Sequence, residues 1–392
     1  MSQKVIEGDN LATLKTYPDN YFDAVVTDPP YGLSFMGKKW DYDVPRVELW
    51  AEVFRVLKPG GHLLAFAGTR TQHRMAVNIE DAGFEIRDLI AWVYGSGFPK
   101  SLDISKAIDK AAGAEREILN YKNLGAGITS FEMGGVNTGK TLNGRDPIKA
   151  QKRAEKAQNY EITAPATDAA KEWEGWGTAL KPALEPITVA RKPIEQTVAA
   201  NVLKYGTGGL NIDGARVEAG NDLGRWPANL IHDGSEEVLK LFPEAGSMDP
   251  NPRNNKVKTG QNGIYGTFEA VTTQGYSDNG GSAARFFYCP KASKSERDNG
   301  LKENKNFHPT VKPVDLMRYL VKLVTPKGGT VLDPFNGSGT TGVACKLEGF
   351  NYVGLEFDPE YCKISRARIK NYVWNPAPEP EPTAPNQLNL FE

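Results

Sequence analysis

Four residues near the start of the chain combine a carboxylate, a stiff turn and an aromatic ring: Asp28, Pro29, Pro30 and Tyr31. They follow the run of residues 24–27, which is typical of a buried parallel strand. Because prolines donate no backbone hydrogen bond and restrict the residue before them, the strand must end here in a rigid turn. Open α/β sheets place their chemistry at such carboxyl ends. The four residues are candidate catalytic residues, although a Pro-Pro pair that only ends a strand has the same local pattern.

A glycine-rich turn much later in the chain is a candidate cofactor site. Residues 337–342 read Gly-x-Gly-x-x-Gly between a predicted strand and a predicted helix. Glycines let the backbone approach a ligand and present N–H groups at a helix N-terminus. Glu356 ends the next predicted strand, where an acidic residue can accept both hydroxyls of a ribose. The Lys-Ser/Thr of a P-loop is absent, so a triphosphate is not indicated, whereas a dinucleotide would fit the turn equally well. The structural alternatives are a tight turn and a surface carboxylate.

Strands and helices alternate through residues 1–95, which predicts a doubly wound α/β sheet. Asp9 follows the first strand and could face the same crevice as Asp28 or cap a helix. Regular structure resumes near residue 286. We expect strands at 5–6, 24–27, 62–67, 84–92, 286–288, 330–332 and 351–355. We expect helices near 11–14 and at 47–57, 71–82, 101–112, 194–203, 235–241, 340–347 and 359–370, and one that residues 308–313 open and that runs to about residue 324.

The segment between these halves, residues 96–285, is rich in Gly, Asn, Pro and Thr, and we interpret it as an inserted, loop-rich region. Basic residues interleaved with aromatic ones suit a nucleic-acid surface, but a solvated basic face beside a packed Trp pair has the same pattern. The glycine-containing loop after Tyr31 adds two adjacent lysines. The candidate DNA contacts are Lys38, Lys39, Trp173, Trp176, Lys181 and Arg191.

Composition sets broad limits. The chain has 392 residues, 40% hydrophobic and 24% charged, which allows one large α/β domain with an insertion or roughly two or three domains. The net charge of −1 means that a nucleic-acid surface would have to be a local stripe. Three cysteines without Cys-x-x-Cys spacing predict no disulfide framework, no metal site and a reducing, cytoplasmic setting. The apolar runs are too short to cross a bilayer, and the start leads into a strand rather than a signal peptide.

Three motifs together resemble the β-class, circularly permuted amino-methyltransferases of DNA, which transfer a methyl group from S-adenosylmethionine to adenine N6 or cytosine N4. The motifs are residues 28–31, residues 308–313 (His-Pro-Thr-Val-Lys-Pro) and residues 333–341 (Asp-Pro-Phe-Asn-Gly-Ser-Gly-Thr-Thr). The resemblance covers roughly residues 4–95 and 286–372. Residues 176–182 and 224–229 also resemble phage and prophage-type members.

This resemblance implies a seven-stranded, Rossmann-like methyltransferase fold, circularly permuted, with a large inserted target-recognition region. It implies four segments: a catalytic half at 1–95, the insertion at 96–285, a cofactor half at 286–374 and a Pro-rich tail at 375–392. It further implies a homodimer that acts on double-stranded DNA, associated with the nucleoid of a bacterial or phage-infected cell.

The resemblance also assigns roles to residues. An exocyclic amine is a poor nucleophile, so the Asp28 carboxylate and the Pro29 carbonyl would accept its hydrogens and stabilise developing positive charge. Tyr31 would stack on the flipped base. Asp9 would lie near the adenine of the cofactor, Lys312 near its carboxylate and Glu356 at its ribose. The implied cofactor-binding set is Asp9, His308, Thr310, Lys312, Pro313, Asp333, Pro334, Phe335, Asn336, Gly337, Ser338, Gly339, Thr340, Thr341, Glu356 and Phe357.

Adenine N6 is the favoured target, because Asp at the first position of residues 28–31 is typical of the adenine enzymes and Ser of many cytosine N4 enzymes. Cytosine N4 is the alternative, and RNA or a protein amide would use the same chemistry. An inactive DNA-binding module and a nicotinamide-dependent oxidoreductase are alternatives from other classes.

The chain ends in an extended, Pro-rich and acidic stretch followed by Gln387, Leu388, Asn389, Leu390 and Phe391. An apolar cluster on a polar tail needs a partner to bury it. The last residues resemble the short peptides that dock on the bacterial sliding clamp. The alternative is that the tail folds back on its own domain.

Overall fold

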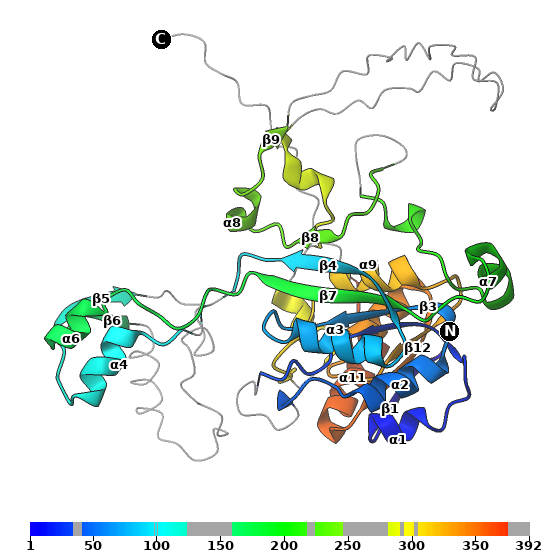
Figure 1. The fold of residues 1–392 in the computed structure, drawn as a ribbon, viewed down its shortest axis with the longest axis horizontal. Helices are drawn as coiled ribbons and strands as arrows, with labels where there is room; N and C mark the ends of the chain where they lie inside the picture. Colours follow the sequence, from blue (N-terminus) through cyan, green and yellow to red (C-terminus); the bar gives the residue numbers. More distant parts are fainter. Residues whose placement is uncertain are drawn as a thin grey trace, which may run out of the picture. The chain divides into compact units, whose positions relative to one another are not determined.

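The computed structural model describes residues 1–33, 41–97, 99, 101–123, 159–217, 224–245, 281–290, 294–301 and 305–374. The chain folds into two compact units (Figure 1). The first combines Met1–Gly95 with Leu184–Glu392, and the second is Ser96–Ala183. The separate unit is therefore shorter than the insertion expected at 96–285. Lys38, Lys39 and the tail from residue 375 lie outside the described residues.

Eight strands of the described residues form the main sheet, in the order β1-β12-β11-β2-β3-β7-β4-β8. Neighbouring strands are parallel except at β7, which is antiparallel to both β3 and β4. The sheet therefore holds eight described strands rather than the seven expected. The bounds are β1 Gln3–Glu7, β2 Phe22–Thr27, β3 Leu57–Phe66, β4 Glu85–Val93, β7 Leu184–Arg191, β8 Leu230–His232, β11 Thr330–Asp333 and β12 Asn351–Glu356.

The two C-terminal strands β11 and β12 lie between β1 and β2. Val331 pairs with Ala24 and Leu332 with Val25, so β11 and β2 are parallel neighbours. Because parallel neighbours end at the same edge of a sheet, the turns that follow β2 and β11 must lie together. This order joins the two halves of the chain in one sheet.

Helices bury both faces of this sheet. On β2, Val26 belongs to one apolar cluster with Leu320 of α9, and Val25 belongs to the other with Trp50 of α2. A strand covered on both faces reads as a continuous apolar run, which is why residues 24–27 show no alternation. The helices of this unit are α1 Asn10–Leu14, α2 Val47–Val56, α3 Gln72–Asp81, α7 Val198–Tyr205, α8 Glu236–Leu239, α9 Val314–Val324, α10 Thr340–Glu348 and α11 Pro359–Asn371.

Short elements complete the description. They are η3 Asp213–Ala215, η4 Ala283–Phe286 and η5 Lys294–Arg297, and the pair β9 Glu244–Ala245 with β10 Gly281–Ser282. In the second unit, α4 Ile104–Ala111 and α6 Asp168–Glu172 accompany the antiparallel pair β5 Ile118–Asn123 and β6 Asn159–Thr163. No helix in the described part of the chain is long and apolar enough to span a bilayer.

One predicted strand is wrong, and the strands within residues 96–285 were not predicted. Residues 286–288 do not form a strand: Phe286 ends η4, and Tyr288 makes a single bridge to Ile231. Their apolar character has another cause, since the Tyr288 ring stacks on Tyr319 at 4.1 Å. Conversely, β7 and β8 of the main sheet lie within residues 96–285, the segment interpreted as a loop-rich insertion. The other predicted strands are confirmed, with shifted ends.

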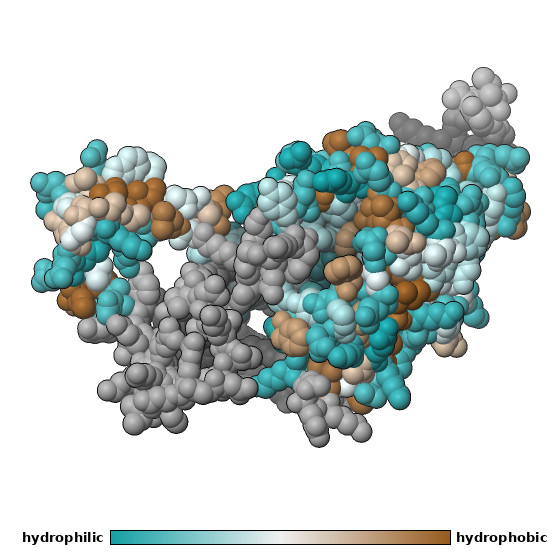
Figure 2. All heavy atoms as spheres, turned by 90° about the horizontal axis from the view of Figure 1, so that it is seen from below, coloured by the Kyte–Doolittle hydropathy of each residue, from teal (hydrophilic) through white to brown (hydrophobic). Residues whose placement is uncertain are grey.

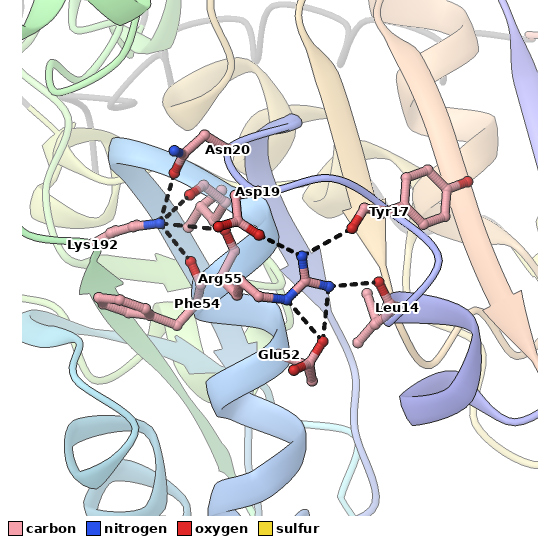
Figure 3. Close-up of polar contacts among 9 residues, drawn as sticks. Leu14, Tyr17, Asp19, Asn20, Glu52, Phe54, Arg55 and Lys192 are labelled. Atoms are coloured by element: carbon pink, nitrogen blue, oxygen red, sulfur yellow. Dashed lines mark hydrogen bonds and ion pairs between the residues drawn. The ribbon is translucent and has the colours of Figure 1, made fainter.

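A polar cluster fixes the amino edge of the sheet (Figure 3). Lys192, just after β7, donates to the carbonyl oxygens of Phe54 and Leu57 at 2.8 and 2.7 Å, which satisfies acceptors at the end of α2. Arg55 ties the segment before β2 to α2. Its guanidinium donates to the carbonyl oxygens of Leu14 and Tyr17 and to the carboxylates of Asp19 and Glu52. These contacts hold the edge opposite to the turns after β2 and β11.

Candidate active site

The turns after β2 and β11 meet through a direct hydrogen bond. The Thr27 hydroxyl, at the end of β2, donates to the Asp333 carboxylate, at the end of β11, over 2.6 Å. Both residues are buried. The expected meeting of the two distant segments at one edge is confirmed.

Asp28 lies in a charged cluster just beyond this contact. The Tyr31 hydroxyl donates to Asp28 Oδ1 at 2.7 Å, and Lys312 Nζ lies 2.7 Å from Asp28 Oδ2. Glu185 completes the cluster, with its Oε2 atom 3.2 Å from Lys312 Nζ and 3.2 Å from the Tyr31 hydroxyl. The cluster combines two carboxylates, one ammonium and one phenol.

The charges of this cluster follow from its burial and its partners. Burial lowers the pKa of Lys312, but the Asp28 and Glu185 carboxylates more than offset this effect, so the pKa lies above its ordinary value. The ammonium is therefore protonated at neutral pH. Burial, followed by the same two carboxylates, raises the pKa of Tyr31 well above 10 and keeps the phenol neutral. Tyr31 is thus a hydrogen-bond donor here.

Lys312 has two protein partners that the sequence did not predict, because its ammonium binds Asp28 and Glu185. Its expected place near the carboxylate of the cofactor stays a prediction. Its side chain is 8% exposed, so two protein carboxylates supply the partners that a buried ammonium requires.

The backbone after Asp28 is held by partners that sequence reasoning missed. The Asp41 carboxylate accepts from the backbone N–H groups of Tyr31, Gly32 and Leu33 at 2.6, 3.0 and 3.2 Å. The Thr71 hydroxyl donates to the Tyr31 carbonyl at 2.6 Å. These bonds, together with buried Pro29 and half-buried Pro30, fix the direction in which Tyr31 leaves the turn.

Glu185 is the functional candidate that sequence reasoning missed altogether. It lies in β7, paired opposite Trp92 of β4. The signal that could have revealed it is the β-branched run of residues 187–189 in a segment bounded by prolines and lysines. Its proximity to Asp28 depends on the antiparallel pairing of β7 with β3, which no local pattern predicts.

The glycine-rich turn has backbone conformations that favour glycine. Gly337 and Gly339 have φ values of +50° and +78°. Gly339 precedes α10 without a side-chain cap, so N–H groups at this helix start have no side-chain partner at the cap position. A Cβ atom at Gly339 would lie 2.6 Å from Ser365 Oγ, which leaves no room for a side chain.

Glu356 lies against this turn. Its carboxylate accepts from the backbone N–H groups of Gly337 at 2.7 Å and Asp358 at 2.9 Å. Burial raises the pKa of Glu356 to about 6, although these two hydrogen bonds act in the opposite direction. Glu356 is thus the last residue of β12 and is linked to the glycine turn, and its role at the ribose stays a prediction.

Asp333 is the most buried carboxylate of the turn. It accepts from Thr27, from the Thr341 hydroxyl at 2.7 Å and from the Phe335 N–H at 3.1 Å. Burial raises the pKa of Asp333 to about 6 against these hydrogen bonds. Asp333 therefore holds the turn together through protein contacts.

Other predicted residues support the turn from outside. His308 lies beside Gly337, where an added Cβ would come within 2.9 Å of its Nε2 atom. Burial lowers the pKa of His308 to about 4, so the imidazole is neutral at pH 7. Buried Arg368, which was not predicted, donates to Ser338 Oγ at 2.9 Å and Thr340 Oγ1 at 3.1 Å.

The remaining predicted residues are distributed around these groups. Asp9 caps α1 by accepting from the Ala12 N–H at 2.8 Å, which is the helix-cap alternative. Its neighbour Asn10 donates to the Pro334 carbonyl at 3.2 Å and so links α1 to the turn. Phe357 is 76% exposed. Asn336 is buried and bonded to Ser365 and Tyr352, whereas Thr310 is exposed and Pro313 precedes α9.

Three of the candidate DNA contacts, Trp173, Trp176 and Lys181, lie in the second unit. Trp173 and Trp176 pack edge to face at 5.1 Å in the second unit and are 40% and 59% exposed, and Lys181 of that unit is exposed. The face of the molecule drawn in Figure 2 shows apolar surface on this unit. Arg191 is wrong as a DNA contact: it is buried at the amino edge of the sheet, with its guanidinium 2.6 Å from Glu85.

The described residues contain no group of three or more His, Cys, Asp or Glu side chains that could hold a metal ion. The ionisable groups of the site are instead paired with one another or with backbone N–H groups. The arrangement can accept hydrogens from a polar substrate at Asp28, offer an aromatic face at Tyr31 and hold a nucleoside-containing ligand at the glycine turn.

Comparison with known proteins gives a family. The family model N6_N4_Mtase, described as DNA methylase, matches residues 22–367. The type II methyltransferase M.HindIII of Haemophilus influenzae is 25% identical over 316 residues, 79% of this chain and 63% of the relative. The type II methyltransferase M2.DpnII of Streptococcus pneumoniae is 44% identical over 63 residues, 16% of this chain and 24% of the relative. The chain thus spans less than two thirds of the length of these relatives.

Two solved structures are also similar. A complex of M1.HpyAVI with SAM is 16% identical, with a TM-score of 0.40, and the match covers 94% of this chain and 100% of that chain. The PvuII DNA methyltransferase, described as cytosine-N4-specific, is 16% identical with a TM-score of 0.43, over 94% of this chain and 86% of that chain.

Proposed function

Because this chain belongs to the N6/N4 DNA methylase family, we propose that it transfers a methyl group from S-adenosylmethionine to adenine N6 of a flipped-out base in double-stranded DNA. The observation that carries the proposal is the Thr27–Asp333 hydrogen bond, because it holds the Asp28 turn against the glycine-rich turn. A carboxylate that can hold an amine and a turn that can hold a nucleoside then open onto one edge of the sheet.

Asp28 does the central work in this proposal. The lone pair of an exocyclic amine is delocalised into its ring, so the nitrogen gains nucleophilicity only when its hydrogens are held out of the ring plane. The Asp28 carboxylate accepts one amine hydrogen and the Pro29 carbonyl the other. Positive charge then develops on the nitrogen beside a carboxylate, which stabilises it.

Lys312 holds the Asp28 carboxylate in place, with its ammonium 2.7 Å from Asp28 Oδ2. After transfer the amine proton passes to Asp28 or to water. The flipped base stacks on the Tyr31 ring, and such stacking contributes about 1–3 kcal/mol per base to binding.

The residues around the glycine turn fit S-adenosylmethionine. When bound, this cofactor supplies a methyl group on a positively charged sulfur and leaves as a neutral thioether. Gly337 and Gly339 let the backbone approach it closely, and a side chain at either position would collide with His308 or Ser365. The two carboxylate oxygens of Glu356 can each accept a hydrogen bond from a ribose hydroxyl. Two backbone N–H groups already orient this carboxylate.

We also propose the permuted β-class arrangement for this chain. The strand order supports it, because β11 and β12 from the end of the chain lie between β1 and β2. In this arrangement the region from residue 96 contributes target recognition as well as β7 and β8. A homodimer, a phage or prophage-type origin, association with the nucleoid and docking of residues 387–391 on the sliding clamp stay predictions.

Cytosine N4 is the second candidate, since its amine presents the same chemistry to Asp28. The family covers both bases, and the PvuII enzyme carries the cytosine-N4 description. Adenine is favoured because position 28 is Asp rather than Ser.

The deciding experiment identifies the product. The full chain is incubated with unmethylated genomic DNA and methyl-tritiated S-adenosylmethionine, and the DNA is digested to nucleosides. We expect the tritium label in N6-methyl-2′-deoxyadenosine. Label in N4-methylcytosine would establish the second candidate, and unlabelled DNA would contradict both.

A further inference from the structure

Glu185 occupies a position that the catalytic proposal does not use. It comes from β7, the one antiparallel strand within the described main sheet, and its side chain is 22% exposed. Its Oε2 atom lies 3.2 Å from both Lys312 Nζ and the Tyr31 hydroxyl. These two groups are the same two that bind Asp28. Glu185 and Asp28 therefore share one ammonium and one phenol.

This sharing matters because Asp28 already has a partner on each oxygen. Tyr31 donates to Oδ1 and Lys312 to Oδ2, both at 2.7 Å. A target amine must find a lone pair on the same carboxylate, in competition with an ammonium that is 8% exposed. A buried ammonium with one carboxylate partner cannot release it, since an uncompensated buried charge is strongly destabilising.

We propose that Glu185 is a positioning residue for methyl transfer, which holds Lys312 and Tyr31 so that Asp28 can turn a lone pair toward the target amine. This inference rests on the proposed function and assigns it a further residue. With Glu185 in place, Lys312 stays compensated when Asp28 engages the amine.

The charge balance of the cluster supports this role. Asp28, Glu185 and Lys312 together carry one net negative charge, because the ammonium stays protonated and Tyr31 stays neutral. The amine becomes positively charged when the N–C bond forms and the S–C bond breaks. A net negative cluster stabilises that charge, and removal of Glu185 would leave a neutral cluster in which Lys312 is committed to Asp28.

Glu185→Gln tests the charge with little change in shape. Its amide oxygen can still accept from Tyr31, but it no longer balances Lys312. The matched control is Glu195→Gln: Glu195 also accepts from a lysine and a tyrosine, Lys204 and Tyr205, each at 2.7 Å, but on the exposed surface. Rates are measured in single turnover on DNA and divided by the S-adenosylmethionine-binding stoichiometry, so that loss of folded protein does not count.

The expected result is a loss of at least about tenfold in single-turnover rate for Glu185→Gln, with an unchanged dissociation constant for S-adenosylmethionine. Glu195→Gln should keep the wild-type rate. The double variant Glu185→Gln/Lys312→Met restores one net negative charge and frees Asp28, so it should be at least about threefold faster than Glu185→Gln alone. A purely structural Glu185 gives no such rescue.

A Glu185→Gln rate within about twofold of wild type overturns the inference, and so does a double variant no faster than Glu185→Gln. If the double variant does not fold, Glu185→Asp decides: it keeps the charge and should exceed Glu185→Gln by about threefold or more, whereas equal rates overturn the inference. Absence of methylation by the wild-type chain is a different outcome, because it contradicts the proposed function itself.

Discussion

The Thr27 hydroxyl donates a 2.6 Å hydrogen bond to the Asp333 carboxylate, although the two residues are 306 positions apart in the chain. One residue beyond Thr27 is Asp28, and a few beyond Asp333 are the glycines of the cofactor turn. The site therefore depends on the pairing of β2 with β11 at its base.

Tyr31 should separate base binding from cofactor binding. Tyr31→Ala removes the stacking face and should weaken binding of an extrahelical base by about 1–3 kcal/mol, or roughly 5- to 150-fold. Tyr31→Phe keeps the ring and should retain most of this affinity. The target position is first identified by sequencing DNA that the protein has modified. Base flipping is then measured by the fluorescence of 2-aminopurine placed at that position. Equal flipping by wild type and Tyr31→Ala would count against a stacking role.

Lys312 should be important for stability as well as for Asp28. Lys312→Met leaves two carboxylates, Asp28 and Glu185, without their shared ammonium. The expected loss of unfolding free energy is about 3–5 kcal/mol, measured by urea denaturation. Lys204→Met is the control, because Lys204 pairs with Glu195 on the surface and should cost at most about 1 kcal/mol. Similar losses of unfolding free energy in both variants would show that the Lys312 ion pairs contribute no more to stability than a surface ion pair.

Asp333 should make stability depend on pH in a defined direction. Burial raises the pKa of Asp333 from 3.8 to about 6, so its stabilising contribution is complete below 3.8 and is lost as the pH rises through 6. Asp333→Asn does not titrate. The free energy of unfolding of the variant, relative to wild type, should rise by about 2–3 kcal/mol between about pH 4 and about pH 7.

Denaturant unfolding of both proteins at several pH values gives this difference directly. His62 and His308, whose pKa burial lowers to about 4, titrate in both proteins and cancel in the comparison. A difference that stays constant with pH would mean that the Asp333 carboxyl titrates normally in the folded protein.

Gly339 should be irreplaceable for reasons of space. Gly339→Ala pays the cost of a positive φ, about 1–2 kcal/mol, and also collides with Ser365. Gly206→Ala is matched, since Gly206 has φ +75° against +78° but nothing within 4 Å of an added Cβ. Thermal unfolding should show a larger loss for Gly339→Ala. Only Gly339→Ala should weaken S-adenosylmethionine binding in a calorimetric titration. Equal affinities of the two variants would contradict a cofactor-binding role for the glycine turn.

Local sequence was sufficient for the elements that carry their own signals. The apolar run before Asp28 predicted β2, and the glycines of residues 337–342 predicted a turn between β11 and α10. The adjacency of these two strands came from the family resemblance, because no local pattern encodes which parallel strands are neighbours.

The residues that sequence reasoning missed depend on contacts between distant elements. Glu185 reaches Lys312 only because β7 pairs antiparallel with β3. Arg368 supports Ser338 because α11 packs on α10, and an arginine in a helix gives no sign that it is buried. The aromatic run of residues 286–288 has the same sequence pattern as a buried strand. In the structure, however, Tyr288 stacks on Tyr319 instead.

Asp28→Ala removes the carboxylate on which the proposed methyl transfer depends. Methyl transfer to DNA is followed in single turnover, and S-adenosylmethionine binding is measured by isothermal titration on the same preparation. We expect a rate at least about 10²–10³-fold below wild type with the cofactor still bound, since the carboxylate that stabilises charge on the amine is gone. Near-wild-type turnover by Asp28→Ala would rule out this role of Asp28.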